Sequence, residues 1–325
     1  MPSAESQLAL ANAERIAGGR LLIVGFDAEV ARALSPATVF HQNRRAYRAA
    51  SGEDVQFGAW FSAEQPYDVA VVEMPKETER LRMTLSMVVA ALRREGRLVL
   101  IGRNDAGIKS AGRHLSEIVG ANEVLDFRFH ARALAATVLV PPSWSSLDVW
   151  ETVFSAEVAE RAIEVHSFPG VFAHGRVDEG TRRLLEVLRV DQGARVLDVG
   201  CGSGVIGAWL NAGGLRCDSV DVDAVAVEAA SRTAGSAWAS DVYSDVQDAY
   251  DSIVTNPPFH AGVRTTSAAA IRMIEGAPAH LVAGGEMWLV ANRFLDYLTP
   301  LRDAFARVDV VHEDNKFRVY RARRA

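Results

Sequence analysis

The stretch VLDVGCGSGVIG, at residues 196–207, decides the fold of this chain. A short apolar run ends at Gly200, and two further glycines follow at positions 202 and 204 before a second apolar run begins. This order predicts a buried strand, a tight turn and the start of a helix. Glycines allow the turn to approach a ligand with bare backbone, and the N–H groups at the helix start favour an anionic group. We therefore predict a ligand-binding turn in an α/β domain.

The turn alone fits two classes of cofactor. Residues 202–207 satisfy the G-x-G-x-x-G fingerprint of nicotinamide-binding domains, and Asp221 follows the next predicted strand, where a carboxylate suits any ribose. However, Asp198 completes the Asp-x-Gly-x-Gly-x-Gly form of methyltransferases, and Asp241 follows the third predicted strand, where such enzymes bind an adenine amine. We therefore favour S-adenosylmethionine over a nicotinamide. The predicted cofactor-binding residues are Asp198, Gly200, Cys201, Gly202, Gly204, Asp221, Asp241 and Asn256.

The tetrapeptide Asn256-Pro257-Pro258-Phe259 identifies the chemistry. It follows an apolar run at 250–255 that predicts a buried parallel strand, and open α/β sheets place their sites at the carboxyl ends of such strands. The Asn256 side-chain carbonyl and the Pro257 backbone carbonyl can accept both hydrogens of a planar exocyclic amine. The prolines stiffen the loop, and Phe259 offers a face on which a base can stack. Asn/Asp-Pro-Pro-aromatic is a signature of methyltransferases that act on such nitrogens.

We accordingly predict Asn256, Pro257 and Phe259 as catalytic residues, and Pro258, Phe259 and His260 as substrate-binding residues. No second histidine or carboxylate lies at relay spacing from His260, so a hydrogen bond to the loop or the substrate edge is favoured over a role as base.

The two halves of the chain repeat one plan. The runs at 20–25, 67–72 and 96–101 resemble those at 195–200, 250–255 and 285–290, and helical patterns separate them. Alternation of this kind predicts two doubly wound, mostly parallel sheets of the Rossmann-like methyltransferase type. We place the domains at 1–145 and 146–325. The first half lacks the glycine turn, because Phe26 and Glu29 occupy it, so we interpret that half as a degenerate copy with a role in stability or RNA contact.

Composition sets broader limits. The chain has 325 residues, a net charge of −6 and two cysteines, which are too few for a disulfide framework or a Cys-rich zinc site. It shows no secretory signal and no apolar run of membrane-spanning length, so a cytoplasmic protein without a metal is expected. Three clusters of arginine, near 44–48, 93–97 and 318–324, are either solvated surface or RNA contacts.

Several stretches resemble the ribosomal small-subunit methyltransferase C family. They are residues 168–172 and 177–181 before the glycine turn, the loop at 256–262, the predicted closing strands at 289–295 and 317–322, and residues 101–110 in the first half. The resemblance covers nearly the whole chain. Arg176 stands where the family often has Gly or Lys, and Thr181 where it has Ser.

This resemblance implies two fused methyltransferase-like domains, of which only the second binds S-adenosylmethionine. It also implies N2-methylation of guanine 1207 in 16S rRNA, with the assembled or nearly assembled small subunit as partner. The residues leave three alternatives: a guanine-N2 enzyme of large-subunit rRNA, a methyltransferase acting on adenine N6 or a glutamine amide, and a catalytically silent RNA-binding assembly factor.

Overall fold

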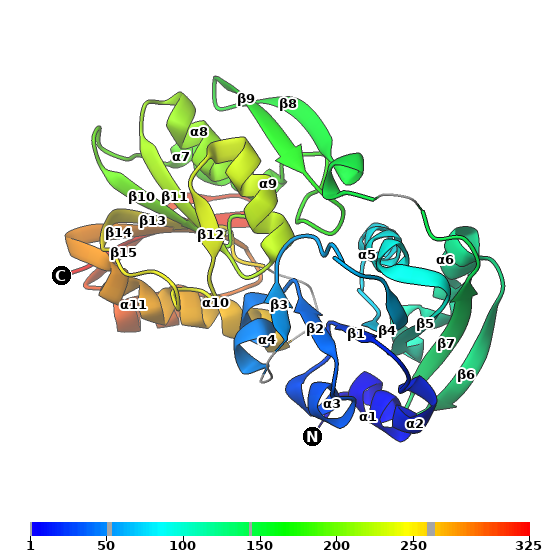
Figure 1. The fold of residues 1–325 in the computed structure, drawn as a ribbon. Helices are drawn as coiled ribbons and strands as arrows, with labels where there is room; N and C mark the ends of the chain where they lie inside the picture. Colours follow the sequence, from blue (N-terminus) through cyan, green and yellow to red (C-terminus); the bar gives the residue numbers. More distant parts are fainter. Residues whose placement is uncertain (1, 51–53, 143–144, 259–263) are drawn as a thin grey trace. The chain divides into compact units, whose positions relative to one another are not determined.

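Each half of the chain builds its own seven-stranded sheet (Figure 1). The computed structural model describes residues 2–50, 54–142, 145–258 and 264–325. The chain divides into two units, Met1–Glu151 and Thr152–Ala325. This division falls a few residues beyond the 145/146 boundary that the proline-rich segment suggested.

The amino-terminal sheet has the strand order β3-β2-β1-β4-β5-β7-β6. Its first five strands run parallel, while β7 is antiparallel to both β5 and β6. The strands are β1 (Leu21–Val24), β2 (Thr38–His41), β3 (Val55–Phe57), β4 (Tyr67–Glu73), β5 (Leu92–Arg103), β6 (Asn122–Arg128) and β7 (Ala131–Val138). The helices are α1 (Ala4–Ala11), α2 (Ala13–Ile16), α3 (Ala28–Ala33), α4 (Arg44–Ala49), α5 (Thr78–Ala91) and α6 (Ile108–Val119), with a 3₁₀ turn at Asn104–Ala106.

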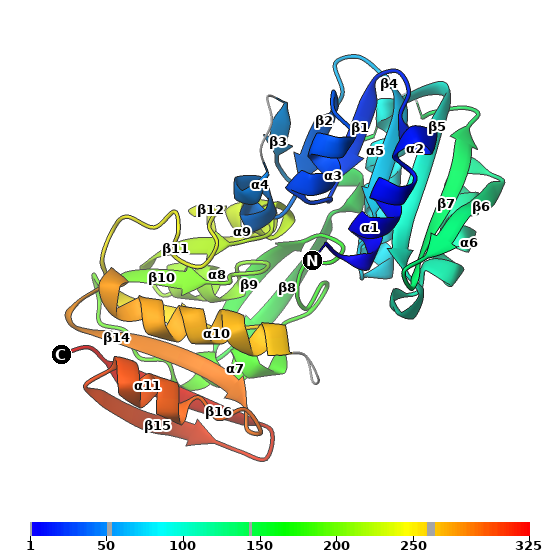
Figure 2. The same ribbon diagram turned by 90° about the horizontal axis from the view of Figure 1, so that it is seen from below.

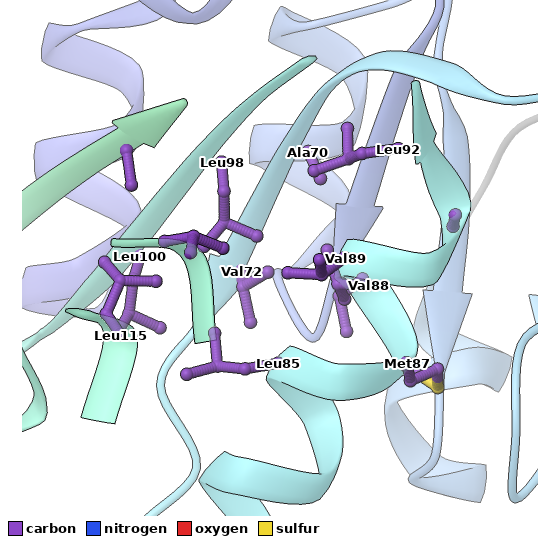
Figure 3. Close-up of a cluster of buried hydrophobic side chains, with 14 of the residues drawn as sticks. Ala70, Val72, Leu85, Met87, Val88, Val89, Leu92, Leu98, Leu100 and Leu115 are labelled. Atoms are coloured by element: carbon purple, nitrogen blue, oxygen red, sulfur yellow. The ribbon is translucent and has the colours of Figure 1, made fainter. Parts of the chain in front are cut away.

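Alternate residues of these strands feed two different cores, one on each face of the sheet. Val72, Leu98 and Leu100 point to the same side as Leu85 of α5 and Leu115 of α6, and together they form the cluster in Figure 3. The intervening residues, such as Val71 and Val99, pack with α1 and α3. The near-continuous apolar runs of β1, β4 and β5 are explained by this burial on both faces.

The carboxyl-terminal sheet repeats the same order, β12-β11-β10-β13-β14-β16-β15, with β16 antiparallel to its neighbours. The strands are β10 (Arg195–Val199), β11 (Arg216–Asp221), β12 (Ala237–Ala239), β13 (Tyr250–Thr255), β14 (Leu281–Asn292), β15 (Arg307–Glu313) and β16 (Phe317–Arg323). The helices are α7 (Glu179–Val187), α8 (Val205–Ala212), α9 (Ala224–Ala234), α10 (Arg264–Gly276) and α11 (Leu298–Ala304), with a 3₁₀ turn at Ala277–His280. A further 3₁₀ turn, Leu147–Trp150, belongs to the amino-terminal unit. The predicted fold class, two tandem doubly wound and mostly parallel sheets, is confirmed.

Helices cover both faces of this second sheet (Figures 1 and 2). Leu184 of α7 and Leu210 of α8 pack on one face with Val254, whereas Ile274 of α10 and Leu301 of α11 pack on the other. Strand β10 pairs with both β11 and β13, so the chain order of the strands reverses beside it. That reversal makes the carboxyl ends of β10 and β13 the topological switch point, where α/β sheets bind ligands.

A two-stranded hairpin, β8 (Thr152–Val158) and β9 (Arg161–Ser167), precedes the second sheet. The sequence did not predict it. It packs against α8 and α9, and the indole of Trp209 on α8 donates a 2.9 Å hydrogen bond to the Val158 carbonyl. The hairpin therefore anchors the segment that leads into the loop at 168–178.

The carboxyl-terminal arginines belong mainly to a strand and are not a loose tail. Arg321 of β16 forms a two-pronged pair with Glu286 of β14, with N–O distances of 2.9 and 2.6 Å, and Arg323 also contacts that carboxylate. Arg318 pairs likewise with Glu313. These contacts give the cluster at 318–324 a structural role between neighbouring strands.

Candidate active site

The glycine turn connects β10 to α8 as predicted. Gly200, Gly202 and Gly204 all have positive φ, between 54° and 77°, which side chains other than glycine rarely tolerate. The Gly200 N–H donates to the Val220 carbonyl of β11 at 2.8 Å, so the turn is fixed to the neighbouring strand. A Cβ atom on Gly204 would lie 2.9 Å from the Cα atom of Ala230. The turn is thus held in a shape that leaves its backbone bare.

Two buried acids flank this turn. Asp198 is fully buried, and neither of its carboxyl oxygens has a hydrogen-bond partner within the described parts of the chain. Burial, together with the nearby charge of Asp221, raises the pKa of Asp198 to about 8. Asp221 ends β11 and accepts hydrogen bonds from the N–H groups of Gly202 and Asp223, both at 3.0 Å. Burial raises the pKa of Asp221 to about 6. Both acids therefore lie beside the turn in an environment that disfavours their charge.

Asp241 lies just after β12, at the same carboxyl edge of the sheet. Its Oδ1 atom is 2.7 Å from Nη2 of Arg272 on α10. The Asp241 N–H donates to the Ser244 hydroxyl at 3.0 Å, which fixes the start of this loop. The structure thus places the third predicted acid just after the strand expected to precede it.

Asn256 follows β13 directly, and β13 is tied to β10 at this point. The Thr255 hydroxyl donates a 2.7 Å hydrogen bond to the Val199 carbonyl, the last residue before the glycine turn. Asn256 is about nine-tenths buried, with 9% of its surface exposed. Its Nδ2 atom donates to Asp178 Oδ2 and to Thr181 Oγ1, both at 2.9 Å. Its Oδ1 atom is buried without a partner among the described residues.

The glycine turn and Asn256 border one pocket. The residues that line it come from the loop before α7, from α7, from the turn and start of α8, and from the end of β13: Phe172, Ala173, Arg176, Asp178, Thr181, Gly200, Cys201, Gly202, Ser203, Val205, Ile206 and Asn256. Four of the predicted site residues, Gly200, Cys201, Gly202 and Asn256, line this pocket. Asp221 adjoins it, because its carboxylate accepts the Gly202 N–H.

Asp178, Thr181, Phe172 and Arg176 line this pocket but were not predicted as site residues. Asp178 and Asn256 are 78 positions apart, so no local spacing connects them. The one usable signal was the stretch at 177–181, which the family resemblance singled out without giving it a role. Of the remaining predicted residues, Pro257 is buried and Pro258 is exposed, while Phe259 and His260 lie outside the described residues.

Within the described ranges, no group of three or more His, Cys, Asp and Glu side chains could hold a metal ion. In the same ranges, every helix is too short or too polar to cross a membrane.

These features define an S-adenosylmethionine-dependent methyltransferase. The sheet is doubly wound, its glycine turn has a bare backbone, acids follow the next strands, and Asn-Pro-Pro lies at the switch point. Two family models agree with this class: Methyltransferase small domain matches residues 162–321, and Methyltransferase small domain N-terminal matches residues 6–150. The chain belongs to the ribosomal RNA small subunit methyltransferase C family.

Relatives of that name support the assignment along nearly the whole chain. The protein from Alcanivorax borkumensis is 35% identical, with 98% of each chain covered, and that from Chromohalobacter salexigens is 41% identical, with 79% of this chain and 78% of the relative covered. Among solved structures, the T. thermophilus 16S rRNA N2 G1207 methyltransferase, in complex with AdoMet and guanosine, has a TM-score of 0.87. It is 26% identical and the match covers 99% of this chain and 92% of that one.

Proposed function

We propose that this protein transfers a methyl group from S-adenosylmethionine to the exocyclic N2 amine of a guanine in 16S rRNA. The observation that carries the proposal is the Oδ1 atom of Asn256, a buried acceptor without a partner in the described residues, in a pocket shared with the glycine turn. A buried carbonyl oxygen of this kind is costly unless a ligand donates to it. A flat amine is a ligand that would do so.

The residues around the pocket suit the cofactor. The backbone of Gly200, Cys201, Gly202 and Gly204 would lie against it, Asp221 would accept from its ribose hydroxyls, and Asp241 would accept from its adenine amine. Asp198 is a buried acid without a cation or a donor in the described structure, and a positively charged ligand nearby would favour its ionised form. When bound, this cofactor supplies a methyl group on a positively charged sulfur.

The side chains of this protein supply orientation. The guanine N2 lone pair is delocalised into the ring, so the free amine is a poor nucleophile. Acceptance of its two N–H bonds by Asn256 Oδ1 and the Pro257 carbonyl would favour a pyramidal nitrogen, with its lone pair directed at the methyl carbon. Methyl transfer would form the N–C bond as the S–C bond breaks, and the amine would then release one proton to water. Positioning of this type contributes on the order of 7–11 kcal/mol when the reacting atoms are well aligned.

The amino-terminal unit does not bind the cofactor in this proposal. Its counterpart of the glycine turn contains Phe26, which is fully buried in the core with α1 and α3. At the position of Asn256 it has Glu73, the last residue of β4, whose pKa is raised to about 7 mainly by burial. A turn without further glycines cannot bring bare backbone against a nucleotide. The unit is left with a role in stability or RNA contact.

The substrate is proposed to be the small ribosomal subunit, with guanine 1207 as the target, and the reaction therefore to occur in the cytoplasm. The T. thermophilus protein named for that guanine supports this choice. An RNA-binding assembly factor without activity would not need an acceptor at Asn256 beside an intact glycine turn.

The test is to incubate the protein and S-adenosylmethionine with small subunits, large subunits and naked 16S rRNA that lack the modification. The methylated nucleoside is then identified by mass spectrometry and its position mapped. N2-methylguanine at position 1207 in small subunits is expected. Methylation of large subunits only, of adenine, or of none of the three would overturn the proposal.

A further inference from the structure

We propose that Asp178 and Thr181 are positioning residues that fix which end of the Asn256 amide faces the substrate. This inference rests on the proposed function, because it concerns the acceptor of the target amine. An asparagine amide has an oxygen and a nitrogen of nearly equal size, and a half-turn exchanges them. After that exchange, two donors would face each other and the target amine would find no acceptor.

Asp178 selects the productive orientation. Its Oδ2 atom lies 2.9 Å from Nδ2 of Asn256, and a carboxylate oxygen accepts hydrogen bonds but has none to donate. With the amide reversed, two oxygens would face each other at this distance. The chemistry of the pair thus determines that the nitrogen of Asn256 points to Asp178 and that its Oδ1 is left for the ligand.

Asp178 is itself held in place by the helix that it caps. The same Oδ2 atom accepts the backbone N–H of Thr181 at 3.0 Å, at the amino end of α7. This N-cap bond satisfies an otherwise unpaired donor of the first helical turn and restricts the carboxylate to one position. The orientation of the Asn256 amide is thereby coupled to a rigid element and not to the loop that follows it.

Thr181 has a different share in the arrangement. Its hydroxyl accepts the second N–H of Asn256 at 2.9 Å, so both amide hydrogens are engaged. A hydroxyl can accept or donate, and Thr181 alone would therefore tolerate either orientation. We infer that Asp178 chooses the orientation and that Thr181 satisfies the remaining donor. Only the hydroxyl of Thr181 makes this contact, so serine at position 181 should serve equally well.

The experiment measures steady-state methylation of small subunits for matched variants. It also measures their affinity for S-adenosylhomocysteine by calorimetry. Asp178→Ser keeps an N-cap residue but removes the carboxylate that reaches Asn256. We expect its kcat to fall about 100-fold, while KM for the small subunit and the affinity for S-adenosylhomocysteine change less than about threefold. In Asp178→Asn, the Thr181 N–H would hold the amide oxygen where the carboxylate oxygen now lies, so most of the rate should be recovered. Thr181→Val should lose about tenfold, and Thr181→Ser should recover it.

Glu179→Gln is the matched control. Glu179 is the neighbouring acid in the first turn of α7, and it pairs with Lys316 on the surface without lining the pocket. Its rate should equal that of the unchanged protein. If Glu179→Gln loses as much rate as Asp178→Ser, general damage to α7 explains both and the inference is wrong.

A double substitution separates positioning from structural support. If Asp178 acts only through Asn256, Asp178→Ser should cost nothing further in an Asn256→Ala background. Additive losses, or a parallel fall in S-adenosylhomocysteine affinity, would overturn the inference. A wild-type protein that methylates no guanine refutes the proposed function instead, whereas an active wild type with an equally active Asp178→Ser refutes only the role given to Asp178.

Discussion

Replacement of Asp198 by asparagine should make the ligand-free protein more stable, and increasingly so as the pH rises. Asp198 is fully buried, its oxygens have no partner in the described structure, and its pKa is raised from 3.8 to about 8. Between these two values the unfolded chain releases the proton and the folded chain keeps it. The wild-type free energy of unfolding therefore falls as the pH rises through this window and levels off above pH 8. Asparagine has no proton to lose and removes this dependence.

The size of the effect follows from the width of the window. One pKa unit corresponds to about 1.4 kcal/mol, so the wild type carries a penalty of about 2 kcal/mol at pH 5.5 and about 5 kcal/mol at pH 8. The advantage of Asp198→Asn should thus widen by about 3 kcal/mol between those values. For a unit of this size, the difference in melting temperature between Asp198→Asn and the wild type should therefore be roughly 6–12 °C larger at pH 8 than at pH 5.5.

The assay is thermal unfolding of the full chain, wild type and Asp198→Asn, at pH 5.5 and pH 8. The transition that S-adenosylhomocysteine shifts in the wild type identifies the carboxyl-terminal unit, because a ligand stabilises the unit that binds it. The variant should also bind S-adenosylmethionine about tenfold more weakly, since it lacks the negative charge that a positively charged ligand would favour at Asp198. A gap that stays constant with pH, or a variant less stable than the wild type at pH 8, would refute the reasoning.

Three further changes have defined outcomes. Gly204→Ala places a Cβ atom 2.9 Å from the Ala230 backbone, at a residue with a φ of +77°. The strain and the clash should cost about 2 kcal/mol or more and lower the melting temperature of the carboxyl-terminal unit. An unchanged melting temperature would show that the turn is not rigid. Arg176 is exposed and lines the pocket, so we expect it to bind the carboxylate of the methyl donor. Arg176→Met should weaken the binding of S-adenosylhomocysteine about tenfold but leave the binding of decarboxylated S-adenosylmethionine unchanged. Equal losses of affinity for both ligands would contradict this role. Glu286→Gln loses charge-assisted bonds to Arg321 and Arg323 at a mostly buried position, and a loss of about 1–2 kcal/mol in chemical denaturation is expected; no loss would show that the pair is fully screened.

The sequence was sufficient for the architecture because local patterns encode it. Strands buried on both faces, such as β10 and β13, are short apolar runs, and the glycines at 200, 202 and 204 are needed for a backbone with positive φ. The hairpin β8–β9 was missed because it precedes the repeated plan of the second half, although alternation of exposed and less exposed residues, as in its strands, is typical of a half-buried strand. The arginines near the end of the chain were ambiguous, since their partners Glu286 and Glu313 are distant in the sequence and meet them only across the sheet.

At the candidate site, too, contacts between residues far apart in the sequence could not be predicted. The positions of Asp198, Asp221 and Asn256 follow from motifs that end predicted strands. The contact of Asn256 with Asp178 and Thr181 depends on the packing of α7 against the end of β13, which no spacing in the chain encodes. Sequence reasoning therefore located Asn256, the proposed acceptor, while the orientation of its amide required side-chain geometry.

The central claim is that the Asn256 amide oxygen accepts the target amine without holding the cofactor in place. Methyl transfer to small subunits and S-adenosylhomocysteine affinity, measured together for Asn256→Ala, test it most directly. We predict a kcat reduced by at least 100-fold with an affinity within about threefold of the wild type. A rate that survives, or an affinity that falls as far as the rate, would contradict the account.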